Sequence, residues 1–192
     1  MWLNRGCQVL LIASTLCFSW LGMMAVHEFG HVMFAWLSGG LVARVVLHPL
    51  VFSRTELQVN PDPLFVAWGG AAVGVVVPLV VSAVWRCRRW RGWPVLQFFA
   101  GFCLVANGIY LGVVSLIPNT ADPGDLMREG CPRWVLIAFG IVAFLFGLFL
   151  WNGLGSQFGL GKAAGTVDRL TATVTFTYLV VLISIELMTY AG

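Results

Sequence analysis

The stretch MMAVHEFGHVMFAWLSGG, residues 23–40, places two histidines and a glutamate inside one of the most apolar runs of the chain. Ionisable side chains are unfavourable in hydrocarbon, and those found within membrane spans usually face a bundle interior or a water-filled cavity. The pattern HExxH runs here from His27 to His31. On a helix the two histidines lie four positions apart, so they leave the same face and can share one metal ion.

The composition around this stretch is typical of an integral membrane protein. Of 192 residues, 59% are hydrophobic and only 10% are charged, and the mean hydropathy is +0.90. A soluble domain carries about 25% charged residues. The net charge of +3 does not indicate a nucleic-acid partner, because the basic residues cluster between apolar runs, where they act as topology signals. The expected surroundings are a lipid bilayer.

Five apolar segments can be assigned as membrane spans. A helix needs about 20 residues to cross a bilayer, and four charge-free runs are long enough: Arg5 to His27, Asp62 to Arg86, Arg91 to Asp122 and Arg133 to Lys162. A fifth run, Leu170 to Ile185, is shorter but reaches Tyr190 if Glu186 is tolerated. The first run begins like a signal peptide but lacks a convincing cleavage site, so we expect it to be retained as a span.

The segment between the first two spans differs from the rest. Residues 41–59 are rich in Val, Leu, Phe and Thr, are interrupted at His48-Pro49, and follow a Gly39-Gly40 helix stop. This pattern predicts a short β-hairpin. The expected fold is therefore an all-α polytopic membrane protein with about five transmembrane helices and a β-hairpin after the first. We treat residues 1–192 as a single membrane-embedded domain.

The distribution of basic residues predicts the orientation of the spans. If all five segments cross, one side holds the larger group, namely Arg5, Arg86, Arg88, Arg89, Arg91, Lys162 and Arg169. The other side holds Arg44, Arg54, Arg128 and Arg133. The positive-inside rule then places the N-terminus in the cytoplasm. We expect a multi-pass protein of the cell (inner) membrane.

The HExxH pattern is typical of a zinc site. Two histidines supply nitrogen ligands, a third protein ligand comes from elsewhere, and an open position holds a water whose pKa the metal lowers toward about 7. Glu28, offset by one residue, can take a proton from that water. The alternative, that His27 and His31 are only polar contacts between helices, requires this spacing among only three histidines to be a coincidence.

The third ligand is expected in VSLIPNTADPGDLMREG, residues 114–130. The first and third spans run in the same direction, so their C-terminal ends lie on the same side of the membrane. Asp122 and Asp125 can therefore reach the histidines, and the spacing does not choose between them. Asp168 falls on the opposite side, whereas Glu186 is on the correct side at an unconstrained distance.

This combination of HExxH with a downstream Pro-Asn-Asp-Gly turn resembles the site-two protease family of intramembrane zinc metalloproteases, over residues 21–130. In that family an aspartate after a Pro-containing turn completes the zinc site, which implies Asp122 as the ligand. Pro123 replaces the glycine that usually follows, so Asp125 stays open as the alternative. The Gly-rich residues 68–79 resemble the family's second span, in which glycines allow close helix packing, although ordinary packing explains them equally well. The 41–59 hairpin resembles the family's edge strand that holds substrate, although an ordinary loop explains it equally well.

The resemblance implies a zinc metalloendopeptidase that hydrolyses peptide bonds in or near single-span segments of other membrane proteins. Its catalytic core would cover about residues 8–130, with accessory spans at about 132–190. His27, His31 and Asp122 would hold Zn²⁺, and Glu28 would act as general base. No regulatory partner can be named from the residues.

Three other functions remain open. One is a catalytically inactive metal-binding chaperone, sensor or scaffold. A metal transporter would need further ligands along several spans. A prenyl-protein-type protease would need a glutamate as third ligand, for which Glu186 is the only candidate. Asn107, within the third span, either lines the site or forms an interhelical hydrogen bond.

Overall fold

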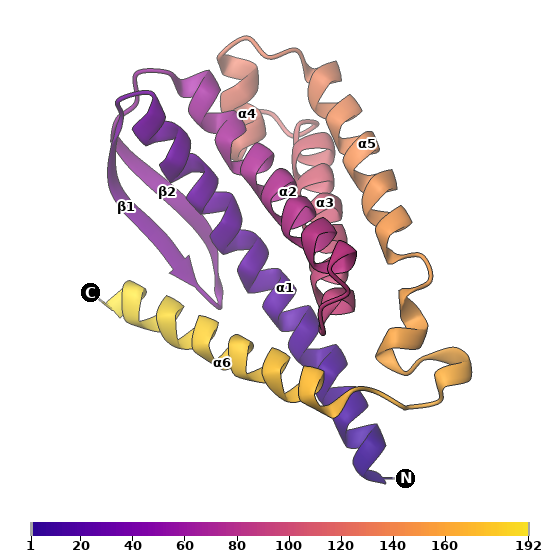
Figure 1. Cartoon of the computed structure of the whole chain (residues 1–192). Helices are drawn as coiled ribbons and strands as arrows, with labels where there is room; N and C mark the ends of the chain where they lie inside the picture. The colour runs from indigo at the N-terminus through magenta and orange to yellow at the C-terminus, as the bar shows by residue number, and fades with distance from the viewer. Residues whose placement is uncertain (1, 192) are drawn as a thin grey trace.

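The fold of the chain is a helical bundle with one β-hairpin, seen in the computed structural model, which describes residues 2–191 (Figure 1). The elements are α1 (Trp2–Leu37), β1 (Leu41–His48), β2 (Val51–Val59), α2 (Pro63–Cys87), α3 (Trp93–Val114), α4 (Ala121–Arg128), α5 (Arg133–Trp151) and α6 (Arg169–Ala191). Two 3₁₀ turns, η1 (Leu154–Phe158) and η2 (Gly161–Ala163), connect α5 to α6. The predicted fold class is confirmed.

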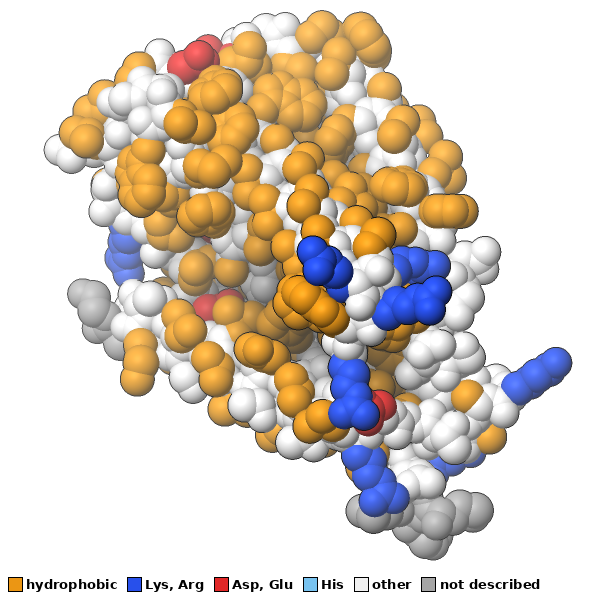
Figure 2. Space-filling view, viewed as in Figure 1, with side chains coloured by type: hydrophobic (Ala, Val, Ile, Leu, Met, Phe, Trp, Pro, Cys, Tyr) orange, Lys and Arg blue, Asp and Glu red, His pale blue; other side chains and the backbone are white. Residues whose placement is uncertain are grey.

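Five of the described helices, α1, α2, α3, α5 and α6, are long and apolar enough to cross a membrane. Large apolar side chains cover much of the outer surface (Figure 2). On α5, for example, Val142 and Phe149 are both 68% exposed. Exposed apolar area on this scale is unusual for a soluble monomer and matches contact with lipid chains. The chain is thus a multi-pass membrane protein by the length and composition of its helices.

Local sequence signals explain where the elements begin and end. Gly39 adopts a left-handed conformation, with φ of 78°, and the Gly40 N–H donates to the Ala35 carbonyl at 2.7 Å, which ends α1. The Asp62 side chain accepts from the Phe65 N–H at 3.1 Å and caps α2. The antiparallel hairpin pairs Leu41 with Val59 and His48 with Val51.

Helix α1 lies at the centre of the bundle. The hairpin and α6 flank one side of it, whereas α2, α3 and α5 lie on the other (Figure 1). Close helix contacts depend on glycine: a Cβ on Gly69 of α2 would lie 2.7 Å from the Gly30 carbonyl oxygen of α1. A Cβ on Gly140 of α5 would likewise lie 2.7 Å from the Gly108 carbonyl oxygen of α3. Small residues are what allow backbones to approach closely in membranes.

Two details of the structure complete the sequence-based expectation, which left the extension of the fifth span past Glu186 open. The fifth span continues past Glu186, whose carboxylate oxygens are both buried and have no hydrogen-bond partner within residues 2–191. Residues 121–128, expected as part of a turn, form the short helix α4. Asn119, just before it, and Ala121, its first residue, have φ of 56° and 49°, and this reversal turns the chain back from the end of α3 toward α1.

Candidate metal centre

The two histidines of the HExxH pattern lie on one face of α1. Their rings are 4.8 Å apart between centroids and nearly perpendicular, and their Nε2 atoms are 3.1 Å apart. Both residues are buried, at 7% exposure. The neighbouring helix α2 presents Gly70 to them, where a Cβ would lie only 2.6 Å from the His27 Nε2. The absence of a side chain at Gly70 thus leaves space beside both nitrogens.

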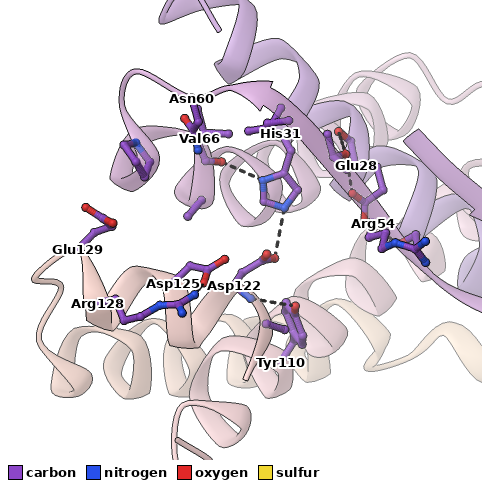
Figure 3. A pocket seen from close by; sticks show the side chains of 16 residues that line it. Glu28, His31, Arg54, Asn60, Val66, Tyr110, Asp122, Asp125, Arg128 and Glu129 are labelled. Atoms are coloured by element: carbon purple, nitrogen blue, oxygen red, sulfur yellow. Dashed lines mark hydrogen bonds and ion pairs between the residues drawn. The ribbon is translucent and has the colours of Figure 1, made fainter. Parts of the chain in front are cut away.

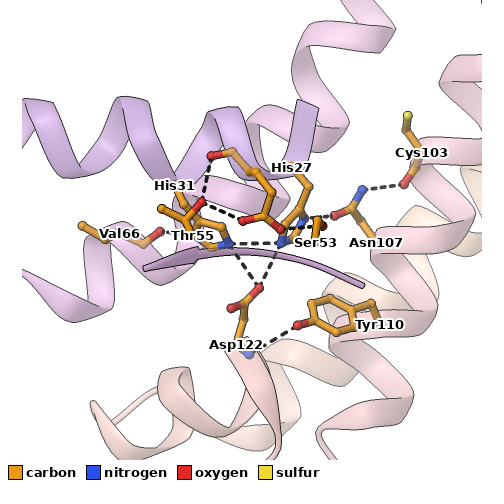
Figure 4. Close-up of polar contacts among 10 residues, drawn as sticks. His27, His31, Ser53, Thr55, Val66, Cys103, Asn107, Tyr110 and Asp122 are labelled. Atoms are coloured by element: carbon orange, nitrogen blue, oxygen red, sulfur yellow. Dashed lines mark hydrogen bonds and ion pairs between the residues drawn. The ribbon is translucent and has the colours of Figure 1, made fainter. Parts of the chain in front are cut away.

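Helix α4 brings a carboxylate to the same point (Figure 4). Asp122 Oδ2 lies 2.9 Å from His27 Nε2 and 3.2 Å from His31 Nε2. Burial by itself raises the pKa of Asp122, but hydrogen bonds from the protonated forms of His27 and His31 outweigh it and hold that pKa well below its ordinary value. Asp122 is therefore a carboxylate at neutral pH.

Hydrogen bonds on the far side of each ring decide which nitrogens carry protons. His31 Nδ1 lies 2.9 Å from the Val66 carbonyl oxygen, which can only accept. His27 Nδ1 lies 2.8 Å from Asn107 Oδ1, while the Asn107 amide nitrogen donates to the Cys103 carbonyl at 2.8 Å. Both Nδ1 atoms are thus donors, so in the neutral rings both Nε2 atoms carry a lone pair.

Three lone-pair donors therefore converge on one point. Ligand atoms from His27, His31 and Asp122 all lie within 4.8 Å of one another. The three closest separations, 2.9, 3.1 and 3.2 Å, are near the spacing of about 3.3 Å between ligand atoms around a tetrahedral zinc with bonds of about 2.0 to 2.1 Å. Lone pairs at this distance repel unless a proton or a metal cation lies between them. The donor set fits a divalent metal, and the Nδ1 hydrogen bonds are the outer contacts typical of metal-bound histidine.

Glu28 is oriented by the hairpin. Its carboxylate accepts hydrogen bonds from Ser53 Oγ and Thr55 Oγ1, each at 2.7 Å, and the side chain is 4% exposed. Both hydroxyls belong to β2 and lie on one face of the strand. Ser53 and Thr55 were not predicted as site residues from the sequence, although two hydroxyl residues on the same face of a strand close to HExxH were the available signal.

A pocket of about 580 Å³ opens beside these residues (Figure 3). Glu28, His31 and Asp122 line it together with Ser53 and Thr55 of β2. Further along the wall are Arg54, Leu57, Asn60, Pro63, Val66, Ala67, Tyr110, Ala121, Asp125, Arg128 and Glu129. The pocket connects the Glu28 and Asp122 carboxylates with the other polar side chains of α4.

The structure separates the candidates for the third ligand. Asp122 lies against both histidines, and its N–H donates to Tyr110 Oη at 3.4 Å. Asp125 lines the same pocket but pairs with Arg128 on the exposed face of α4. Glu186 is not part of the group around His27 and His31. Asn107, for which two roles were open, contacts His27 directly.

Comparison of the chain with protein-family models, with curated proteins and with solved structures finds no match. The function therefore has to be inferred from the chemistry of the site.

Proposed function

We propose that the protein is an intramembrane zinc metalloprotease that hydrolyses peptide bonds in or near the membrane-spanning segments of other proteins. The observation that carries the proposal is the convergence of three possible ligand atoms from His27, His31 and Asp122 beside a buried glutamate. These three residues would hold the zinc ion. When bound there, zinc supplies Lewis acidity, which polarises a carbonyl group and lowers the pKa of water.

The side chains of the chain itself supply the proton transfers. Glu28 is one residue from His27 and is held in place by two hydroxyls. In the proposed reaction it accepts a proton from the attacking water and then donates it to the amine of the leaving peptide. A base fixed by two hydrogen bonds does not have to be reoriented at each turnover.

Substrate would be held along β2. The sheet formed by residues 2–191 has two strands, so within this range one edge of β2 is not paired with another strand, and residues of β2 line the pocket. A helical substrate hides its carbonyl groups in internal hydrogen bonds and must be extended before hydrolysis. Addition of the extended segment to a strand edge satisfies its backbone groups inside a low-dielectric environment. We further propose that the N-terminus is cytoplasmic and the host membrane is the cell membrane, because the basic residues concentrate on one side.

The test compares the wild type with Glu28→Gln and Asp122→Asn for zinc content and for cleavage of candidate single-span substrates. We expect Glu28→Gln to retain zinc and to lose cleavage, and Asp122→Asn to lose both. Retained function in Glu28→Gln would instead indicate a metal-binding chaperone, sensor or scaffold. Wild-type protein that binds no zinc would overturn the proposal altogether.

A further inference from the structure

The charges outside the spans are distributed unequally between the two ends of the molecule. The end where α2 stops and α3 and α6 begin carries most of the basic residues, namely Arg5, Arg86, Arg88, Arg89, Arg91, Lys162 and Arg169, whereas Asp168 is its acidic residue. Figure 2 shows Lys and Arg side chains gathered over this part of the visible face, next to largely apolar surface. This end therefore has a strong positive charge.

A pocket of about 440 Å³ lies within this basic end. It is bounded by the α2–α3 loop on one side and by η1 and the start of α6 on the other. Its inner wall includes Leu11, Val95 and Phe158, which belong to a buried apolar cluster. Arg89 and Arg91 line the same pocket. The cavity thus combines an apolar floor with a cationic wall.

The positive charge of this pocket is only partly neutralised by the chain itself. Among the described residues, neither Arg89 nor Arg91 forms an ion pair. Asp168 is the acidic side chain in the lining, and its Oδ2 accepts from the Thr171 hydroxyl at 2.6 Å and from the Thr171 N–H at 3.3 Å. That carboxylate caps the start of α6, and the hydrogen bonds from Thr171 and, to a smaller extent, the Arg91 charge hold its pKa below the ordinary value. Two arginines and one aspartate therefore leave the lining with a net positive charge.

The loop that carries the two arginines is held by aromatic side chains. The Trp85 indole N–H donates to the Arg91 carbonyl at 3.2 Å, and the Trp85 and Trp90 rings meet edge to face at 4.4 Å. Arg86 lies over the Trp93 ring at 4.9 Å. Tryptophan is enriched where membrane helices meet the headgroup layer, so the pocket lies at the depth of lipid headgroups.

We propose that this pocket binds the headgroup of an anionic phospholipid. Guanidinium groups match phosphate oxygens in geometry as well as charge, and basic pockets between membrane helices at the headgroup level suit anionic lipids. The apolar floor accommodates the glycerol and the first acyl carbons, which free phosphate lacks. Basic loops that only set topology require charge but no cavity. The inference is independent of the metal centre.

The test uses native mass spectrometry of the detergent-solubilised full chain, with phosphatidylglycerol and phosphatidylcholine added in competition. The variant is Arg89→Asn/Arg91→Gln; asparagine is chosen because Arg89 has φ of 52°, a conformation that asparagine tolerates. Each basic residue near an anionic surface contributes about a fivefold gain in affinity. We therefore expect the double variant to bind phosphatidylglycerol about 25-fold more weakly, with phosphatidylcholine binding unchanged.

The matched control is Arg44→Gln/Arg133→Gln, which removes the same charge from exposed positions outside this pocket. It should retain the wild-type preference for phosphatidylglycerol. An equal loss of phosphatidylglycerol binding in the control would show that only the net charge of the protein matters, which would overturn the proposal. A wild-type protein that does not prefer phosphatidylglycerol over phosphatidylcholine would by itself overturn the proposal. Displacement of phosphatidylglycerol by inorganic phosphate at similar concentration would also overturn it, because the apolar floor would then contribute nothing.

Discussion

Replacement of Gly70 by alanine tests the geometry of the metal centre most directly. The new Cβ would lie 2.6 Å from His27 Nε2 and closer still to His31 Nε2. Ordinary van der Waals contact begins at 3.4 Å, so His27 Nε2 would have to retreat by about 0.8 Å in a close-packed interior. Metal–ligand distances tolerate only about 0.2 Å of change. The imidazole pair therefore cannot accept the methyl group and keep its present separation.

We expect Gly70→Ala to weaken zinc binding by about 100-fold or more. Removal of one outer hydrogen bond from a metal site costs about 10- to 100-fold in affinity, and displacement of two ligand atoms should cost at least as much. Helix propensity acts in the opposite direction, because alanine favours a helix over glycine by about 1 kcal/mol. A loss of zinc would therefore reflect the site and not a weaker α2. The effect should appear in the zinc content of purified protein and in competition titrations with a chelator.

The control is Gly6→Ala on α1, where a Cβ meets nothing within 4 Å. It should bind zinc like the wild type. Thermal unfolding of all three proteins would show whether the Gly70 variant is folded. A folded Gly70→Ala protein with wild-type zinc affinity would refute the assignment of Nε2 atoms as the ligands.

Three further outcomes are expected. Asn107→Leu removes the acceptor for His27 Nδ1 and should lower zinc affinity by about 10- to 100-fold, measured by chelator competition. Ser53→Ala/Thr55→Val frees the Glu28 carboxylate and should lower cleavage about 10- to 100-fold at unchanged zinc content, as expected for lost orientation of a catalytic group. Asp125→Asn breaks only an exposed pair and should leave zinc content unchanged and the free energy of unfolding within about 0.5 kcal/mol.

Each outcome has a result that contradicts it. Unchanged zinc affinity in the Asn107 variant would mean that the His27 ring is not oriented by this amide. A matched control for the hydroxyl variant is Thr173→Val, because that hydroxyl bonds only to its own helix; equal loss of cleavage there would point to general destabilisation. Loss of zinc in Asp125→Asn would mean that Asp125, and not Asp122, is the third ligand.

The spans and the hairpin were predictable because their signals are local. Charge-free runs of sufficient length define the membrane helices, and Gly39-Gly40 together with the interruption at His48-Pro49 delimit the strands. The positions where α2 and α3 begin likewise follow from the charged residues Asp62 and Arg91, which lie just before them. None of these inferences requires knowledge of which helices are neighbours.

The contacts around the site were harder to predict because they depend on tertiary geometry. Helix α4 was missed since Asp122-Pro123-Gly124 has the composition of a turn, and the left-handed Asn119 and Ala121 leave no clear trace in sequence. Spacing alone could not separate Asp122 from Asp125. Only the reversal of the chain after α3 decides that the first of the two faces the histidines.

The orientation of the Glu28 carboxylate depends on the alignment of two strands as well as on the helix that carries it. Side chains alternate along a strand, so a one-residue slip of β2 would turn Ser53 and Thr55 away and present Arg54 to the carboxylate instead. The connection between His48 and Val51 fixes that alignment. We therefore expect one extra residue in this turn, far along the chain from HExxH, to abolish the proposed proton transfer while His27, His31 and Asp122 stay in place.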